Sequence, residues 1–287
     1  MSPSNQQRLL ISFAHPDDES FGMGGAIAKY AEKGVDIYLI CSTNGDAGTV
    51  DDGMLAAYES VGELRLAELA CAATKLGIKE VIPFGYHDSG MMGSPDNNNP
   101  NCLFQADDEV VTEKIVREIR RIRPQVVVTF DAYGGYGHPD HIVMHRTTTR
   151  AFYEAGDPTK YPEQGLEPYQ PAKLYYSSFP RLSLRLWIWE MRLRGQNPRQ
   201  LGRNKDLDLV EALHRQMPIH ALVDVSPYQK TWDEASECHA SQQNPRRTTG
   251  LSDRVRRLIY RKQEFTRAYP APNGRRKERD LFEGISG

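Results

Sequence analysis

The chain has 287 residues, enough for one large domain or two small ones with a full hydrophobic core. Its 36 basic and 38 acidic residues give a net charge of −2, which argues against nucleic acid or a membrane surface as partners. No run approaches the roughly 18 apolar residues of a membrane span, and the first eight residues are polar, so we expect a cytoplasmic protein.

Strands and helices alternate in the first half of the chain. Apolar runs predict strands at 8–14, 35–42, 80–84 and 125–130, and the segments between them predict helices at 21–33, 56–76 and 108–122. Gly34 and Gly77 fit helix ends, and Pro124 follows the third helix. Such alternation implies right-handed βαβ units with a parallel sheet. We therefore expect an α/β fold over 1–155, a Rossmann-like, parallel-rich sheet flanked by helices.

Beyond residue 155 the pattern loosens, and we expect a C-terminal α+β extension within a single domain of 1–287. Further strands are predicted at 172–179 and 219–226, and the charged tail is expected to be solvated.

The segment 181–217 between those two strands is rich in arginine. Leu182, Leu186, Trp189 and Leu193 recur at helical spacing, which favours an amphipathic surface helix in an inserted segment. A substrate lid and a contact between subunits are alternative interpretations. The region around Trp187 and Trp189 is the candidate surface for a homo-oligomer.

The four cysteines are far apart and form no C-x-x-C pair: Cys41, Cys71, Cys102 and Cys238. This spacing argues against a disulfide framework and against a structural zinc knuckle, and it favours a reducing compartment.

Polar clusters follow two of the predicted strands. "HPDD" places His15, Asp17 and Asp18 after the first strand, and "HPDH" places His138 and His141 after the fourth. The carboxyl ends of parallel strands lie at one edge of a sheet, so the two clusters can meet there. Two histidines and one carboxylate are a common ligand set for catalytic zinc. The sequence predicts His15, Asp18 and His141 as ligands of Zn²⁺, with Fe²⁺ as the alternative metal.

Each cluster alone also has an ordinary interpretation. A lone His-Pro-Asp is usually a turn, and two adjacent acids are usual at a helix N-terminus. The occurrence of both clusters at two strand ends favours the metal site. His145 lacks the neighbouring glutamate of an H-E-x-x-H pair, so we expect it to pack or to support the site.

Glycine residues after the first strand raise the alternative of dinucleotide binding. Ile27 stands where the third glycine of G-x-G-x-x-G would fall, and no acidic residue ends the second strand. We expect Gly22, Gly24 and Gly25 instead to let the helix pack closely against the sheet.

These residues are recognisable. "AHPDDE" at 14–19 with "GHPDH" at 137–141 resembles the LmbE/PIG-L superfamily of zinc-dependent N-deacetylases, which act on N-acetylglucosamine attached to another group. "YHDSGM" at 86–91 and "CHASQ" at 238–242 extend the resemblance, which is weakest across 181–217. The chain is most similar to the actinobacterial branch, which contains the mycothiol-pathway deacetylase and the mycothiol S-conjugate amidase.

The resemblance assigns the same three ligands, and it implies that Asp17 is the general base. It implies that His138 is a general acid or stabilises the oxyanion, and that Tyr136 polarises the substrate carbonyl. Further residues match positions that bind the substrate: Arg65, Asp88 and, with the least defined role, His239.

The implied activity is hydrolysis of an N-acyl amide on a small, glucosamine-containing substrate. An N-acetylglucosaminyl-inositol in a low-molecular-weight thiol pathway fits best. The alternatives are a mycothiol S-conjugate amidase and a deacetylase of a secondary-metabolite amino sugar. A non-enzymatic sugar-binding module is disfavoured, because the base and the ligand set are complete.

Overall fold

The computed structural model describes residues 6–201, 205, 207–242, 260–272, 274 and 277–285. In this part of the chain seven strands form one sheet, in the order β3-β2-β1-β4-β5-β7-β6. The strands are β1 (Arg8–Phe13), β2 (Asp36–Thr43), β3 (Glu80–Tyr86), β4 (Val126–Thr129), β5 (Lys173–Ser178), β6 (Ala221–Asp224) and β7 (Lys262–Tyr269). The α-helices are α1 (Asp18–Glu32), α2 (Val61–Leu76), α3 (Asp108–Ile122), α4 (Gly134–Gly137), α5 (Pro139–Glu154), α6 (Arg181–Leu193), α7 (Leu209–Arg215) and α8 (Gln229–Cys238).

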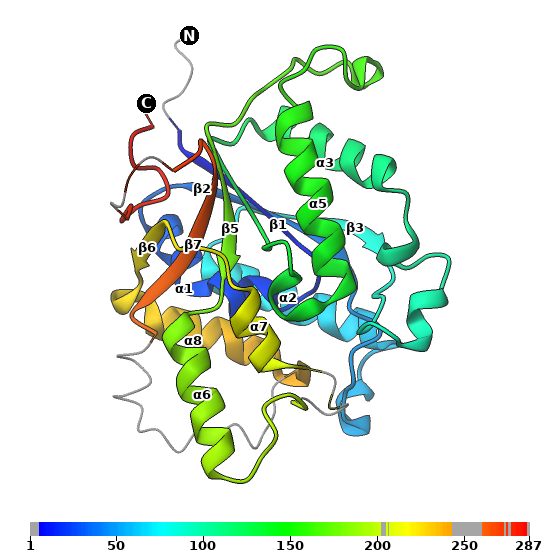
Figure 1. Ribbon diagram of the computed structural model, residues 1–287. Coiled ribbons are helices and arrows are strands. Elements are labelled where there is room, and N and C mark those ends of the chain that lie inside the picture. The colour runs from blue at the N-terminus through cyan, green and yellow to red at the C-terminus, as the bar shows by residue number, and fades with distance from the viewer. Residues whose placement is uncertain are drawn as a thin grey trace.

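Strands β1 to β5 form the parallel part of the sheet that the sequence predicts. β1 pairs in parallel with β2 and β4, β2 with β3, and β4 with β5. Helices α1, α2 and α8 pack together, and α3 packs on α5 in a second layer (Figure 1). Because helices cover both faces, β1 is apolar without alternation: Leu9, Leu10 and Ile11 are fully buried. The α/β prediction is confirmed.

The second half of the chain extends the same sheet with antiparallel strands. β7 pairs antiparallel with both β5 and β6. The sequence did not predict β7 or α8. In β7 the buried positions include the polar Gln263, whose side-chain oxygen accepts the Ala26 N–H at 2.6 Å. The strand therefore lacks the alternation of apolar residues that reveals a half-buried strand.

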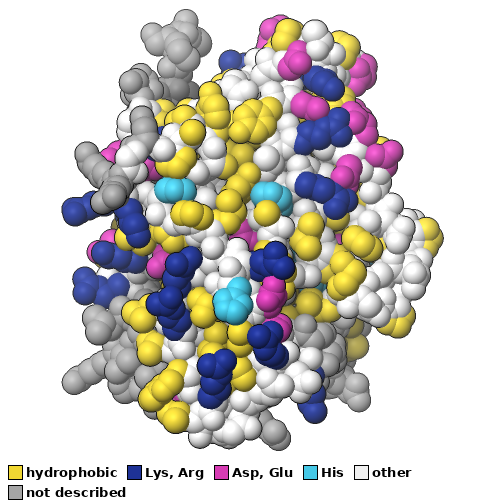
Figure 2. Space-filling view, viewed as in Figure 1, with side chains coloured by type: hydrophobic (Ala, Val, Ile, Leu, Met, Phe, Trp, Pro, Cys, Tyr) yellow, Lys and Arg dark blue, Asp and Glu magenta, His cyan; other side chains and the backbone are white. Residues whose placement is uncertain are grey.

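Helix α6 lies where the sequence predicts a helix. Most of the apolar residues that predicted it, however, face outward. Leu182, Trp189 and Leu193 are 58%, 61% and 66% exposed, whereas Leu184 and Ile188 are buried in a small cluster with α7. Apolar and basic side chains lie interspersed over this region (Figure 2). The lid and the subunit contact stay predictions.

Two packing details correct expectations from the sequence. A Cβ on Gly24 would lie 2.5 Å from the Trp232 ring, and one on Gly25 would lie 2.9 Å from Val225. Gly24 and Gly25 thus make room for α8 and the segment before it, not for the sheet, and a Cβ on Gly22 would meet no atom within 4 Å. In the tail, Glu278 is buried instead of solvated.

A disulfide joins Cys71 of α2 to Cys238 of α8, which are 167 positions apart in the sequence. The expectation of unpaired cysteines is wrong for this pair, because α2 and α8 pack against each other and sequence spacing cannot show this. Cys41 and Cys102 are free and buried. Among the described helices, none has the length and apolar character to cross a membrane.

Candidate functional site

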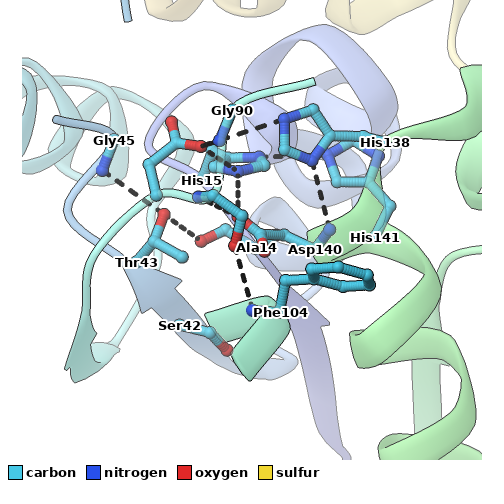
Figure 3. Close-up of polar contacts among 12 residues, drawn as sticks. Ala14, His15, Ser42, Thr43, Gly45, Gly90, Phe104, His138, Asp140 and His141 are labelled. Atoms are coloured by element: carbon cyan, nitrogen blue, oxygen red, sulfur yellow. Dashed lines mark hydrogen bonds and ion pairs between the residues drawn. The ribbon is translucent and has the colours of Figure 1, made fainter. Parts of the chain in front are cut away.

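The two predicted clusters meet at the carboxyl edge of the parallel strands. His15 follows β1, and His138 and His141 lie at the start of α5, which follows β4. Figure 3 shows the three imidazoles grouped with Asp140. All four residues are buried, with exposed fractions of 7% or less.

One ring nitrogen each of His15 and His141 and the carboxylate of Asp18 lie close together. Nδ1 of His15 is 3.1 Å from Nε2 of His141. The carboxylate oxygens of Asp18 lie 3.4 Å from that His15 nitrogen and 3.3 Å from that His141 nitrogen. The three predicted ligands are thus brought together.

The other nitrogen of each histidine has its own acceptor. His15 Nε2 donates to Asp140 Oδ2 at 3.1 Å, and His141 Nδ1 donates to the Gly134 carbonyl at 3.1 Å. In neutral imidazoles this leaves two lone pairs facing each other beside the Asp18 carboxylate. Acceptors gathered at one point suit a cation between them, so this group of residues fits a metal ion.

The charges around the site favour a cation as well. Burial opposes a charged imidazolium, but the carboxylates of Asp88, Asp140 and Asp18 hold the pKa of His15 well above its usual value. Burial also opposes ionisation of Asp18, yet His141 and His15 hold the pKa of its carboxyl well below the usual range. Within the described residues, His15 and His138 belong to two overlapping groups whose ligand atoms lie within 4.8 Å, one completed by His141 and the other by Asp88 and Asp140.

Asp140 is a site residue that the sequence analysis missed. It is fully buried, and its Oδ2 also accepts the Ser89 N–H at 2.9 Å. A signal was present, because Asp140 is the third residue of the second His-Pro-Asp motif, as Asp17 is of the first.

Asp17 lies beside the predicted ligands, and its carboxylate forms a hydrogen bond with Arg65. Arg65 Nη2 donates to its Oδ2 at 3.0 Å. Burial raises the pKa of Asp17 to about 6, against the opposing charge of Arg65. The backbone of Asp17 has φ +126°, a conformation that residues other than glycine rarely adopt.

Arg65 is buried, and most of its donors are already used inside the protein. Nη1 donates to the Gly45 carbonyl at 2.8 Å, and Nη2 donates to the Pro16 carbonyl at 2.7 Å as well as to Asp17. In this geometry Arg65 holds the loop that carries Asp17. A direct contact with substrate stays a prediction.

His138 is the N-cap of α5, and this position determines which of its ring nitrogens carries the hydrogen. Its Nδ1 accepts the Asp140 N–H at 3.2 Å, so a neutral ring carries its hydrogen on Nε2, which lies 3.8 Å from Asp88 Oδ1. Burial, with the neighbouring His15 and His141, holds the pKa of His138 well below its usual value.

Tyr136 and Asp88 complete the edge of the site. The Tyr136 ring packs on His141 with the centroids 5.0 Å apart, and burial raises the pKa of its phenol. Asp88 Oδ1 lies 3.4 Å from His15 Nε2 and accepts the Gly90 N–H at 2.9 Å. Burial opposes the charge of Asp88, but His15 lowers the pKa of its carboxyl.

His239 does not line the site. Its side chain is fully buried, and Nε2 hydrogen-bonds to Glu19 at 2.7 Å. The substrate-binding role that the resemblance implies for it stays a prediction. His145, as expected, packs on Tyr176 and donates from Nδ1 to the Phe130 carbonyl.

Fold and site together define the class: an α/β protein with a buried histidine–carboxylate centre, suited to a metal ion, at the carboxyl edge of its parallel strands. The family model described as PIG-L, GlcNAc-PI de-N-acetylase, matches residues 10–152. The chain belongs to this family, as the sequence motifs predict.

Relatives with curated names support this membership. The 1D-myo-inositol 2-acetamido-2-deoxy-alpha-D-glucopyranoside deacetylase of Thermobifida fusca is 44% identical over 186 residues, which are 62% of this chain and 64% of that protein. The chain therefore spans a little under two thirds of that relative. The enzyme of the same name from Acidothermus cellulolyticus is 36% identical over 293 residues, covering 96% of this chain and 94% of that protein.

A solved structure shows the same fold. The N,N'-diacetylchitobiose deacetylase from Pyrococcus horikoshii, in complex with an inhibitor, superposes with a TM-score of 0.62 at 18% identity. The match covers 92% of this chain and 84% of that one, which confirms the architecture of the sheet and its helices.

Proposed function

We propose that the protein is a metal-dependent N-deacetylase whose substrate is an N-acetylglucosaminyl-inositol, the substrate class in the names of its relatives. The observation that carries the proposal is the convergence of His15, Asp18 and His141 on one point, with Asp17 beside them. In line with the sequence resemblance, the reaction belongs to the making of a low-molecular-weight thiol.

His15, Asp18 and His141 are the proposed ligands of Zn²⁺, and Fe²⁺ suits the same donors. When bound, zinc lowers the pKa of a water molecule toward 7 and polarises the acetamide carbonyl. Asp140 and the Gly134 carbonyl orient the two histidine rings, so that the other nitrogen of each ring would be free to hold the ion.

Asp17 is the proposed general base. Its buried carboxylate, held by Arg65, takes a proton from the attacking water, whose oxygen forms a bond to the carbonyl carbon. As the carbon–nitrogen bond breaks, the proton held by Asp17 is available for the departing amine. The products are acetate and the free amino sugar.

His138 and Tyr136 are the proposed donors to the oxyanion. Of the two roles that the resemblance allows for His138, the hydrogen on Nε2 favours this one. A single donor of this kind contributes roughly 3 kcal/mol to the transition state. Asp88 is the proposed partner of the sugar hydroxyls.

Amine release tests the function. N-acetylglucosaminyl-inositol and a mycothiol S-conjugate are compared side by side, each with zinc-loaded and with chelator-treated protein. Faster release from the acetyl sugar, lost on chelation and restored by zinc, is the expected result. Faster turnover of the conjugate would instead make the protein a detoxifying amidase, and turnover that survives complete metal removal would overturn the metal centre.

A further inference from the structure

Glu19 and His239 form a buried pair next to the proposed base. Glu19 lies in the first turn of α1, and His239 directly follows α8, 220 positions later. Their side chains are fully buried, and His239 Nε2 lies 2.7 Å from Glu19 Oε1. Within the described residues, the side chains of Glu19 and His239 form no hydrogen bond or ion pair with the three predicted metal ligands.

The other oxygen of Glu19 holds the backbone of Asp17. The Asp17 N–H donates to Glu19 Oε2 at 3.1 Å. This is the residue with φ +126°, and such a strained backbone persists only when its surroundings fix it. Ser20 donates its hydroxyl to Glu19 Oε1 at 2.6 Å, so the carboxylate is held at the turn from both sides.

The His239 side chain has no other hydrogen-bonding partner within the described residues. Its Nδ1 is buried without a hydrogen bond, which is unfavourable for a histidine that only fills space. Its ring is edge-on to Phe21, with the centroids 5.8 Å apart. The one polar contact of the side chain is therefore directed at Glu19.

We propose that Glu19 and His239 are positioning residues that fix the orientation of Asp17. The inference rests on the proposed function, in which Asp17 is the base. His239 orients the Glu19 carboxylate, Glu19 holds the Asp17 N–H, and the strained turn then aims the Asp17 side chain at the reacting water. A misplacement of about 1 Å at such a group can lower a rate by roughly 100-fold.

Two independent ties hold the segment that carries His239. Ser241 donates from its backbone N–H at 2.8 Å and from its hydroxyl at 2.6 Å to Glu68 of α2. The Cys71–Cys238 disulfide is the second tie. Ser241 thus offers a matched control, because its side chain anchors the same segment without touching Glu19.

The experiment compares H239A, H239Q and S241A with the wild type. We expect H239A to lower kcat roughly 10- to 100-fold, with KM and bound zinc unchanged. H239Q should recover most of kcat, because its amide can donate to Glu19 from the place of Nε2. S241A should keep kcat, because it removes only the hydroxyl bond to Glu68 and leaves the Glu19–His239 pair intact. An unchanged kcat in H239A, or equal losses of kcat in H239A and S241A, would overturn the proposal.

A second readout does not depend on turnover. Hydrogen exchange of the Asp17 amide, followed by NMR in protein with selectively labelled aspartate, should speed up in H239A and stay at the wild-type rate in S241A. Unaltered exchange in H239A would refute the positioning role. If the wild type cleaves no acylated amino sugar, the proposed function fails. The exchange rates would still show whether His239 fixes the backbone of Asp17.

Discussion

Asp140 accepts a hydrogen bond from Nε2 of His15 at 3.1 Å, across 125 positions of sequence. The two residues belong to the two His-Pro-Asp motifs, so each motif completes the other. The bond fixes the tautomer of His15 and turns its Nδ1 toward Asp18 and His141.

This relationship predicts the behaviour of D140N. An asparagine fits the same space but removes the charge that supports the His15 N–H, so zinc affinity should fall about 10- to 100-fold. Competition with a chelator of known affinity measures the change, and circular dichroism checks that the fold is kept. Wild-type zinc affinity in D140N would show that Asp140 does not orient the ligand.

Asp17 and Asp18 should separate chemistry from metal binding. D17A should keep its zinc and lose activity by roughly 10²- to 10⁴-fold, because the base is gone and the ligands are intact. D18A should lose bound zinc, because a ligand carboxylate is gone. Metal analysis beside amine-release kinetics distinguishes the two variants, and full activity in purified D17A would refute the base.

The sequence predicted the part of the site that local pattern and sheet topology determine. Two apolar strands, each followed by a polar cluster, are enough to bring His15 and His141 to one edge. Contacts between α8 and the first two helices follow no such rule, so neither the Glu19–His239 pair nor the Cys71–Cys238 bridge could be found in the sequence.

Buried polar residues explain the other differences between the predicted and the observed structure. Gln263 in β7 and Glu278 in the tail are both buried because they have partners from distant segments. A pattern of hydrophobicity assigns such residues to the surface. Helix α6 shows the reverse, since Trp189 is apolar and exposed.

The disulfide between α2 and α8 should contribute to stability. Disulfides typically stabilise the folded state by about 2–4 kcal/mol. We expect C71S/C238S to unfold at lower temperature and denaturant concentration than the oxidised wild type. Reductant should lower the wild-type Tm and leave that of the double variant unchanged.

Thiol titration gives the control for this prediction. The denatured, oxidised wild type should show two reactive thiols, from Cys41 and Cys102. Four reactive thiols in freshly purified protein would contradict the bridge.

Glu278 should make stability depend on pH in the acid range. Its carboxylate is paired with Lys173 and Arg267, each at 2.7 Å, and accepts the Tyr175 hydroxyl at 2.6 Å. Burial opposes the charge, but Lys173 and the Tyr175 hydroxyl lower the pKa of Glu278 from its usual value of 4.5. Because the folded-state pKa is lower, this group stabilises the fold above about pH 4.5, and its contribution is lost as pH falls through the folded pKa.

The variant E278Q tests this expectation. At pH 7 it should lower the free energy of unfolding by about 3 kcal/mol, because Lys173 and Arg267 lose their anionic partner. The difference from the wild type should shrink as the pH is lowered below 4.5, where the wild-type carboxyl also becomes neutral. Denaturant unfolding of chelator-treated protein from pH 7 downward measures both curves without metal release. E163Q, at an exposed glutamate in the short 3₁₀ helix Pro162–Gln164, is the control. A difference between E278Q and wild type that stays constant over this pH range would mean that the Glu278 charge does not stabilise the fold.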